Sequence, residues 1–157
     1  MQCNTSFSLG SIENFNVFKT NPKLLKRLRI NDSEDNFYEA HQLYKTIHFR
    51  CTTAKDFKEA RDVIFNGILF FYTKKSDNVY YCSDLSKTFI ETLKKFDNQT
   101  PDLIDSDLLS KIKLIHLALQ RGHEERNEFV CTILKWSGSL FSSNKNSKLT
   151  DKSLERY

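Results

Sequence analysis

Glycine and proline are scarce in this chain of 157 residues, with four copies and two copies. An all-β fold needs such residues in the turns between its many short strands, so their scarcity argues against that class. Aromatic residues make up 13% of the sequence, which argues against a disordered chain. The composition therefore predicts long helices with short connections, in one domain with a modest core.

Long apolar runs and a strong net charge are both missing. The longest apolar stretch, Val63–Tyr72, is interrupted by Asn66 and Gly67 and is shorter than the roughly 18 residues of a membrane-spanning helix. The net charge of +4 is below that of a dedicated nucleic-acid-binding domain. The N-terminus is polar and shows no secretion signal. We therefore predict a cytosolic protein without direct membrane insertion and without a nucleic-acid partner.

Patterns typical of catalysis and metal binding are missing too. The sequence holds four well-separated cysteines: Cys3, Cys51, Cys82 and Cys131. None belongs to a CxxC pair, and the last three fall in apolar helical patterns, so we predict reduced, buried thiols. His41 and His48 share a helix face about 10 Å apart, too far for one metal ion without further ligands. Because no phosphate-binding glycine motif and no carboxylate pair is present, we predict no enzyme and no cofactor.

Apolar residues recur at the spacing of an α-helix through most of the chain. They predict about six helices, near residues 22–30, 36–51, 56–72, 77–96, 101–119 and 123–140. From Val63 onward the third of these is apolar nearly all round, which predicts an inner helix buried on two sides. The predicted organisation is an irregular N-terminal segment (1–20), an α-helical repeat domain (21–140) and a polar tail (141–157).

A short repeat marks the start of two of these helices. "FYEAHQL" at 37–43 and "FKEARDV" at 57–63 share the pattern aromatic-x-Glu-Ala, twenty residues apart. That spacing fits one helix and a tight turn, and the alanines let neighbouring helices approach closely. The repeat predicts an all-α fold, an α-solenoid of antiparallel helix pairs like those of tetratricopeptide repeats. Such proteins commonly bind other proteins along a helical face.

The same stretches carry a family resemblance. "YEAHQLYKTIHFR", followed by A-x-x-F-x-E-A-R and "GILFF", resembles the N-terminal half of Golgi-to-ER traffic protein four. "SDLSKTFIETL" and "ILKWSGS" match later segments of that family, so the resemblance covers about residues 36–139. It implies an α-solenoid that serves as a cytosolic adaptor in the targeting of tail-anchored membrane proteins to the ER.

The resemblance also implies partners and contact residues. The N-terminal half of the family docks on the dimeric targeting ATPase of this pathway. The C-terminal half, which we expect to be missing from this chain, holds a ubiquitin-like partner and a BAG-family scaffold. The residues that the resemblance implies as the ATPase-binding face are Tyr38, Lys45, Arg50 and Asp84. Two of them have other interpretations, since Arg50 could be a solvated arginine and Asp84 could cap its helix. A general helical-repeat interaction module with another ligand is the alternative function.

Overall fold

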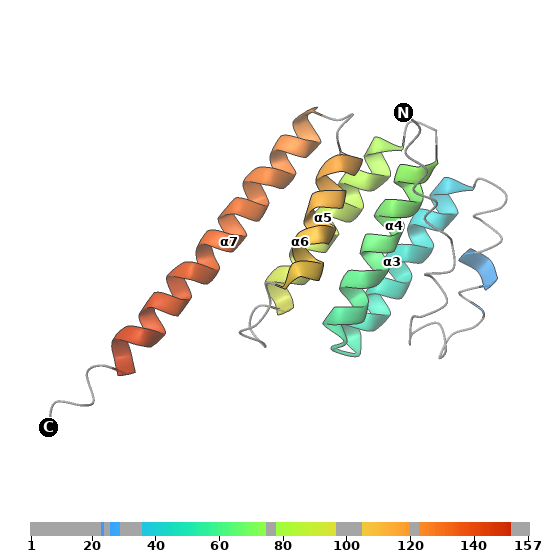
Figure 1. Cartoon of the computed structure of the whole chain (residues 1–157). Helices are drawn as coiled ribbons and strands as arrows, with labels where there is room; N and C mark the ends of the chain where they lie inside the picture. Colours follow the sequence, from blue (N-terminus) through green and yellow to red (C-terminus); the bar gives the residue numbers. More distant parts are fainter. Residues whose placement is uncertain are drawn as a thin grey trace, which may run out of the picture.

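A computed structural model describes residue 23 and residues 26–28, 36–74, 78–96, 105–119 and 123–151, with side chains up to residue 142. Every element with assigned bounds is an α-helix: α3 (Phe37–Thr53), α4 (Phe57–Thr73), α5 (Val79–Phe96), α6 (Ser106–Ala118) and α7 (His123–Asp151) (Figure 1). The predicted all-α fold is confirmed. Residues 23 and 26–28 are helical as well, whereas the predicted irregular segment 1–20 lies outside the described residues.

Consecutive helices run antiparallel and alternate between two layers. The inner helix α4 packs against α3 and α5 and also contacts α6, while α5 contacts α7. Helices α3, α5 and α7 therefore form one layer, and α4 and α6 form the other (Figure 1). This arrangement is the α-solenoid of helix pairs that the repeat predicts.

The aromatic-x-Glu-Ala repeat marks two capped helix starts. The side chain of Asn36 accepts a hydrogen bond from the backbone N–H of Glu39 at 3.4 Å, and Asp56 accepts one from Glu59 at 3.1 Å. The glutamate thus stands at the third helical position, where a capping box places it and where a negative charge favours the helix N-terminus. The repeat in the sequence is therefore a repeated helix-start signal followed by a buried alanine.

Two helix boundaries differ from their predicted positions. Helix α6 begins at Ser106 and not near residue 101, because Asp105 caps it by accepting a backbone N–H hydrogen bond at 2.7 Å. Helix α7 continues to Asp151, so its backbone stays helical well into the predicted polar tail, 141–157. Residues 141–151 contain no glycine or proline, and polar side chains alone do not end a helix.

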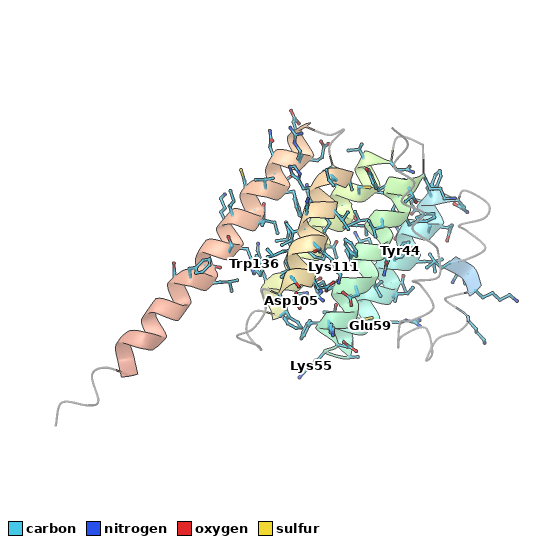
Figure 2. The ribbon with its side chains drawn as sticks, in the orientation of Figure 1. Tyr44, Lys55, Glu59, Asp105, Lys111 and Trp136 are labelled. Atoms are coloured by element: carbon cyan, nitrogen blue, oxygen red, sulfur yellow. The ribbon has the colours of Figure 1, made fainter. Side chains whose placement is uncertain are left out.

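Gly67 lies where α3 and α5 both approach α4. A Cβ atom at this position would lie 2.9 Å from Cδ1 of Leu85 on α5 and 3.0 Å from Cγ of Tyr44 on α3. Both neighbours are fully buried, and Figure 2 shows Tyr44 among the packed side chains. Only a residue without a side chain lets the three helices pack this closely. Helix α4 is the predicted inner helix, with buried positions at Val63, Ile64, Phe65, Gly67, Ile68, Phe70 and Phe71.

The cysteines divide into two groups. Cys51 and Cys82 are buried, as predicted, and burial raises the pKa of each thiol to about 12. The prediction was wrong for Cys131, which is exposed on the outer side of α7 because the apolar stripe that packs inward is Phe129, Ile133, Trp136 and Leu140. Cys3 lies outside the described residues. Within the described ranges, no helix is long and apolar enough to cross a bilayer.

We predict that Gly67→Ala lowers the free energy of unfolding by about 1 kcal/mol, because overpacking outweighs the gain in helix propensity. Gly138 on α7 is the matched control, since a Cβ there would meet nothing within 4 Å. In dilute solution Gly138→Ala should stabilise the chain by up to about 1 kcal/mol. Urea unfolding of both variants measures the difference. Shifts of the same sign would contradict the role assigned to Gly67.

Candidate docking face

Helix α3 presents a face of mixed aromatic and charged residues away from the core. Tyr38 and Phe49 are 61% and 69% exposed, although both are large aromatic side chains. Gln42 and Lys45 lie between them at helical spacing, so the four residues share one side of the helix. We call these four residues together with Asp84 of α5 the docking face.

Asp84 joins α5 to α3 through one oxygen atom. Its Oδ2 lies 2.9 Å from Nε2 of His41 and 2.9 Å from Nζ of Lys45. A carboxylate only accepts hydrogen bonds, so Nε2 of His41 carries the hydrogen in this contact. Since α5 begins at Val79, Asp84 stands too far into the helix to be its cap, and the capping interpretation is wrong. Asp84 instead links two successive repeats at the base of the docking face.

Burial and the neighbouring charges shift the pKa values of Asp84 and His41 in opposite directions. Burial alone would raise the pKa of Asp84, but the hydrogen bonds and charges of Lys45 and His41 outweigh it and lower the pKa. For His41, burial lowers the pKa, and the neighbouring Asp84 offsets this only in part. The ring of His41 lies 5.0 Å from the ring of Tyr81, which explains part of its loss of solvent. The Asp84 carboxylate is therefore kept ionised while His41 is held neutral.

His48 lies about two turns beyond His41 on the same side of α3. Its Nε2 is 2.8 Å from Oγ1 of Thr92 on α5, and Thr92 in turn donates to the carbonyl of Thr88 at 2.8 Å. Because the threonine hydrogen is used in that second bond, His48 donates and Thr92 accepts. The pKa of His48 is lowered to about 4, chiefly by burial and to a smaller extent by the charges of Lys95 and Lys45. The contact is a neutral hydrogen bond that holds α3 to α5.

An open hollow lies beside the docking face, between the first turns of α5 and α7. Its lining includes Tyr80, which is 71% exposed, together with Asp84 and Lys87 of α5. From α7 come Glu124, Glu125 and Glu128, and Lys87 pairs with Glu128 at 3.1 Å. The hollow therefore extends the docking face with an aromatic ring and an excess of negative charge.

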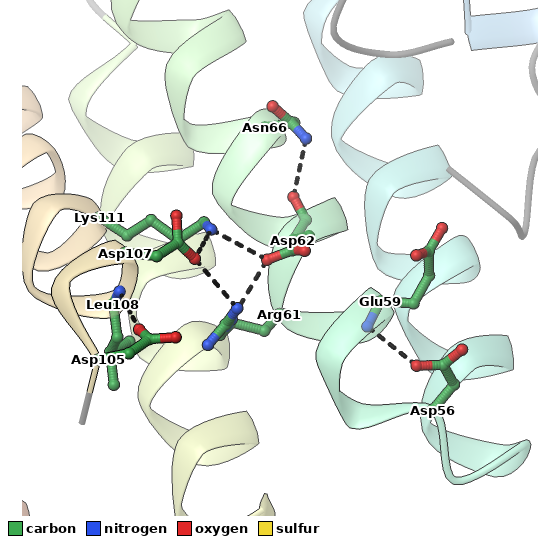
Figure 3. Close-up of polar contacts among 9 residues, drawn as sticks. All are labelled: Asp56, Glu59, Arg61, Asp62, Asn66, Asp105, Asp107, Leu108 and Lys111. Atoms are coloured by element: carbon green, nitrogen blue, oxygen red, sulfur yellow. Dashed lines mark hydrogen bonds and ion pairs between the residues drawn. The ribbon is translucent and has the colours of Figure 1, made fainter. Parts of the chain in front are cut away.

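A second polar cluster joins the helices of the other layer. Arg61 of α4 contacts Asp62 at 3.2 Å and Asp107 of α6 at 3.3 Å, and Lys111 contacts both carboxylates (Figure 3). The hydrogen bond from Lys111 is the main cause that lowers the pKa of Asp107. Since Arg61 is buried and each charge has an opposite charge beside it, this cluster holds α4 to α6 and leaves little for a partner.

The predicted contact residues do not all lie together. Tyr38 and Lys45 share the docking face, and Asp84 lies against Lys45. Arg50 is exposed, but it lies on another side of α3. It follows Lys45 by five residues, and each residue of a helix turns the chain by about 100°. The sequence analysis did not include Phe49 among the contact residues. An aromatic residue that lies off the apolar stripe of its helix could have indicated this exposed position. The contacts of His41 were missed as well, because no local pattern predicts a partner 43 residues away.

The histidines and Cys51 form no common site. His41 contacts Asp84, whereas His48 contacts Thr92. Among the described residues, no group of three His, Cys, Asp or Glu side chains could hold a metal ion. Polar side chains lie between the helices of each layer, and they hold one repeat against the next.

These features define a class: a helical-repeat protein whose exposed aromatic and charged residues gather on one face of a two-layer helix stack. Comparison with known proteins narrows this class to one group of relatives. No family model matches the chain. Curated relatives do match over 111 residues, which is 71% of the chain. They include the Golgi to ER traffic protein 4 homologs of Gallus gallus (33% identical), Takifugu rubripes (35%) and Homo sapiens (32%).

The matched stretch belongs to the Golgi to ER traffic protein 4 family, in agreement with the resemblance in the sequence. The alignment covers 34%, 32% and 32% of those three relatives, so the chain spans about a third of their length.

We predict that the chain loses stability in mild acid through His48. Its pKa is about 4 in the folded state against an ordinary 6.5, so below pH 6.5 the unfolded chain takes up a proton that the folded chain does not. The contribution is present above that range and is lost as pH falls from 6.5 to 4. After allowance for solvent screening we expect about 1–2 kcal/mol.

Urea unfolding at pH 7 and pH 5 tests this expectation, because His48→Gln should lose less stability between the two values than the unmodified chain. His116→Gln, at an exposed histidine of α6, is the control and should leave the difference unchanged. An equal loss in the His48→Gln variant would contradict the assignment.

Proposed function

We propose that the chain is an adaptor that docks on the dimeric targeting ATPase of the pathway for tail-anchored membrane proteins, and that it does so through the docking face. Membership in the Golgi to ER traffic protein 4 family suggests a role in traffic to the ER. The adaptor role and the ATPase as partner rest on the resemblance noted in the sequence. The proposal assigns no chemistry to the chain itself.

The observation that supports this surface most is the exposure of Tyr38 and Phe49. Large aromatic side chains are enriched among the residues that dominate protein–protein binding energy, and here two of them flank a charged residue on one helix. Because both rings are mostly exposed, they contribute little to packing among the described residues. A partner that covers them would gain apolar burial on both sides of Lys45.

The ion pairs beneath these residues support the same surface. Lys45 is held by Asp84, and Asp84 is held by His41, which is 4% exposed. A side chain fixed in this way loses less conformational freedom when a partner binds, which favours affinity. Asp84 and the glutamates of the adjacent hollow also give the surface negative charge, which suits a basic region of the partner.

The test measures the affinity of the purified chain for the purified targeting ATPase, with and without ATP. We expect Phe49→Ala to weaken binding by about tenfold, because it removes an exposed aromatic contact without touching the core. Leu109→Ala is the matched control, since Leu109 is 57% exposed but lies on α6 in the other layer. An equal affinity for both variants would reject the docking face.

Arg50→Glu tests the remaining predicted contact residue. A reversed charge at an exposed position of α3 should slow association if Arg50 faces an acidic group of the ATPase. Affinity unchanged by Arg50→Glu but weakened by Phe49→Ala would remove Arg50 from the contact surface and keep the rest.

The alternative function is a general helical-repeat module with another ligand. The exposed charges of the docking face fit many partners, so this alternative is favoured if the chain does not bind the ATPase in either nucleotide condition. The ubiquitin-like partner and the BAG-family scaffold belong, by the resemblance, to the C-terminal half of the family, and the present proposal is confined to the ATPase.

A further inference from the structure

His41 is a buried polar side chain directly beneath the docking face. Its ring lies 6.2 Å from the ring of Phe71 on α4 and 5.0 Å from the ring of Tyr81 on α5. Those two rings are stacked on each other at 4.9 Å, so α4 and α5 together hold the imidazole in place. A polar group in such surroundings costs free energy unless it is hydrogen-bonded. The hydrogen bond that satisfies Nε2 of His41 is the one to Asp84.

Asp84 is held by two side chains of different kinds. The amine of Lys45 ends a long, flexible side chain that is 42% exposed, so a partner can reach it and draw it away from Asp84. The shorter side chain of His41 is buried between aromatic rings that do not leave it room to turn. His41 therefore keeps the carboxylate of Asp84 in place even when Lys45 turns towards a partner.

This arrangement leaves one oxygen of Asp84 available. Both contacts use Oδ2, each at 2.9 Å. Oδ1 makes no hydrogen bond or ion pair with any residue that the structure describes, and Asp84 lines the open hollow between α5 and α7. A carboxylate held by Lys45 alone would follow the flexible amine, and the position of Oδ1 would no longer be fixed.

We propose that His41 is a positioning residue for ATPase binding: it fixes the carboxylate of Asp84 so that Oδ1 can accept a hydrogen bond from the ATPase, and it does not contact the ATPase itself. This inference rests on the proposed function. A group held in its binding geometry before the partner arrives loses less conformational freedom on binding. The fold alone does not require the histidine, because Lys45 already links α3 to α5 through Asp84.

A purely structural role for His41 is the alternative. Its hydrogen bond also joins α3 to α5, so its removal would lower stability whether or not Asp84 binds a partner. His48 offers a matched comparison, since it joins the same two helices through Thr92 at 2.8 Å and does not contact Asp84. Replacing each histidine by leucine therefore separates the loss of a contact between helices from the loss of positioning.

The affinity of the purified chain for the purified targeting ATPase tests the proposal. His41→Leu should weaken binding by about fivefold, because the carboxylate of Asp84 is no longer held in its binding position. His48→Leu should change the affinity by less than about twofold, although it removes a hydrogen bond between the same helices. His41→Gln, whose amide can donate in place of Nε2, should restore most of the affinity. Circular dichroism confirms that each variant remains folded.

A double-mutant cycle tests whether His41 acts through Asp84. If it does, His41→Leu should have no further effect on the affinity of a chain that already carries Asp84→Asn.

A second measurement uses the chain without the ATPase. Burial raises the pKa of Asp84, and the hydrogen bonds from Lys45 and His41 lower it. His41→Leu should therefore raise this pKa in an NMR titration of the Asp84 carboxyl carbon, whereas His48→Leu should leave it unchanged. An Asp84 pKa that stays the same in the His41→Leu chain would show that His41 does not hold the carboxylate.

Two results of the binding experiment would also overturn the proposal. One is an equal loss of affinity in the His41→Leu and His48→Leu chains, which would make the role of His41 structural. The other is an undiminished effect of His41→Leu in the chain that carries Asp84→Asn. In both cases the unmodified chain still binds the ATPase, so the proposed function stands. An unmodified chain that does not bind the ATPase rejects the proposed function itself, and the positioning role with it.

Discussion

The close approach of α3 and α5 to α4 at Gly67 is the contact on which the rest of the described structure depends. Tyr44 and Leu85 occupy the space that a side chain at this position would need. This contact sets the distance between α3 and α5, which are neighbouring helices of the other layer. The hydrogen bonds from His41 to Asp84 and from His48 to Thr92 need that distance, because each joins α3 to α5 with a side chain of fixed length.

Much of the fold could be predicted from the sequence because its signals are local. Each signal can be read within one or two helical turns. These signals are the apolar stripes, the capped helix starts at Asn36 and Asp56, and the scarcity of glycine and proline. The end of α7 was less predictable. Its C-terminal residues are polar without being helix breakers, and no single residue marks where the helix stops.

The candidate site was only partly predictable, since its geometry depends on contacts between distant helices. The resemblance identified Tyr38, Lys45 and Asp84 by residue type, but not that one carboxylate oxygen receives both Lys45 and His41. Periodicity placed Cys131 with the buried thiols, because α7 carries apolar residues on two opposite sides and the sequence does not say which side packs. Such ambiguity arises wherever one helix has two stripes.

The turn between α3 and α4 has a consequence for how this chain can vary. Lys55 adopts a left-handed conformation (φ 61°), its N–H bonds to the carbonyl of Thr52, and the N–H of Asp56 bonds to that of Cys51. Asp56 thus closes one helix with its backbone and opens the next with its side chain. A residue inserted here would break both sets of hydrogen bonds at once. Insertions and deletions acquired during evolution should therefore be excluded from this turn and accumulate in other connections.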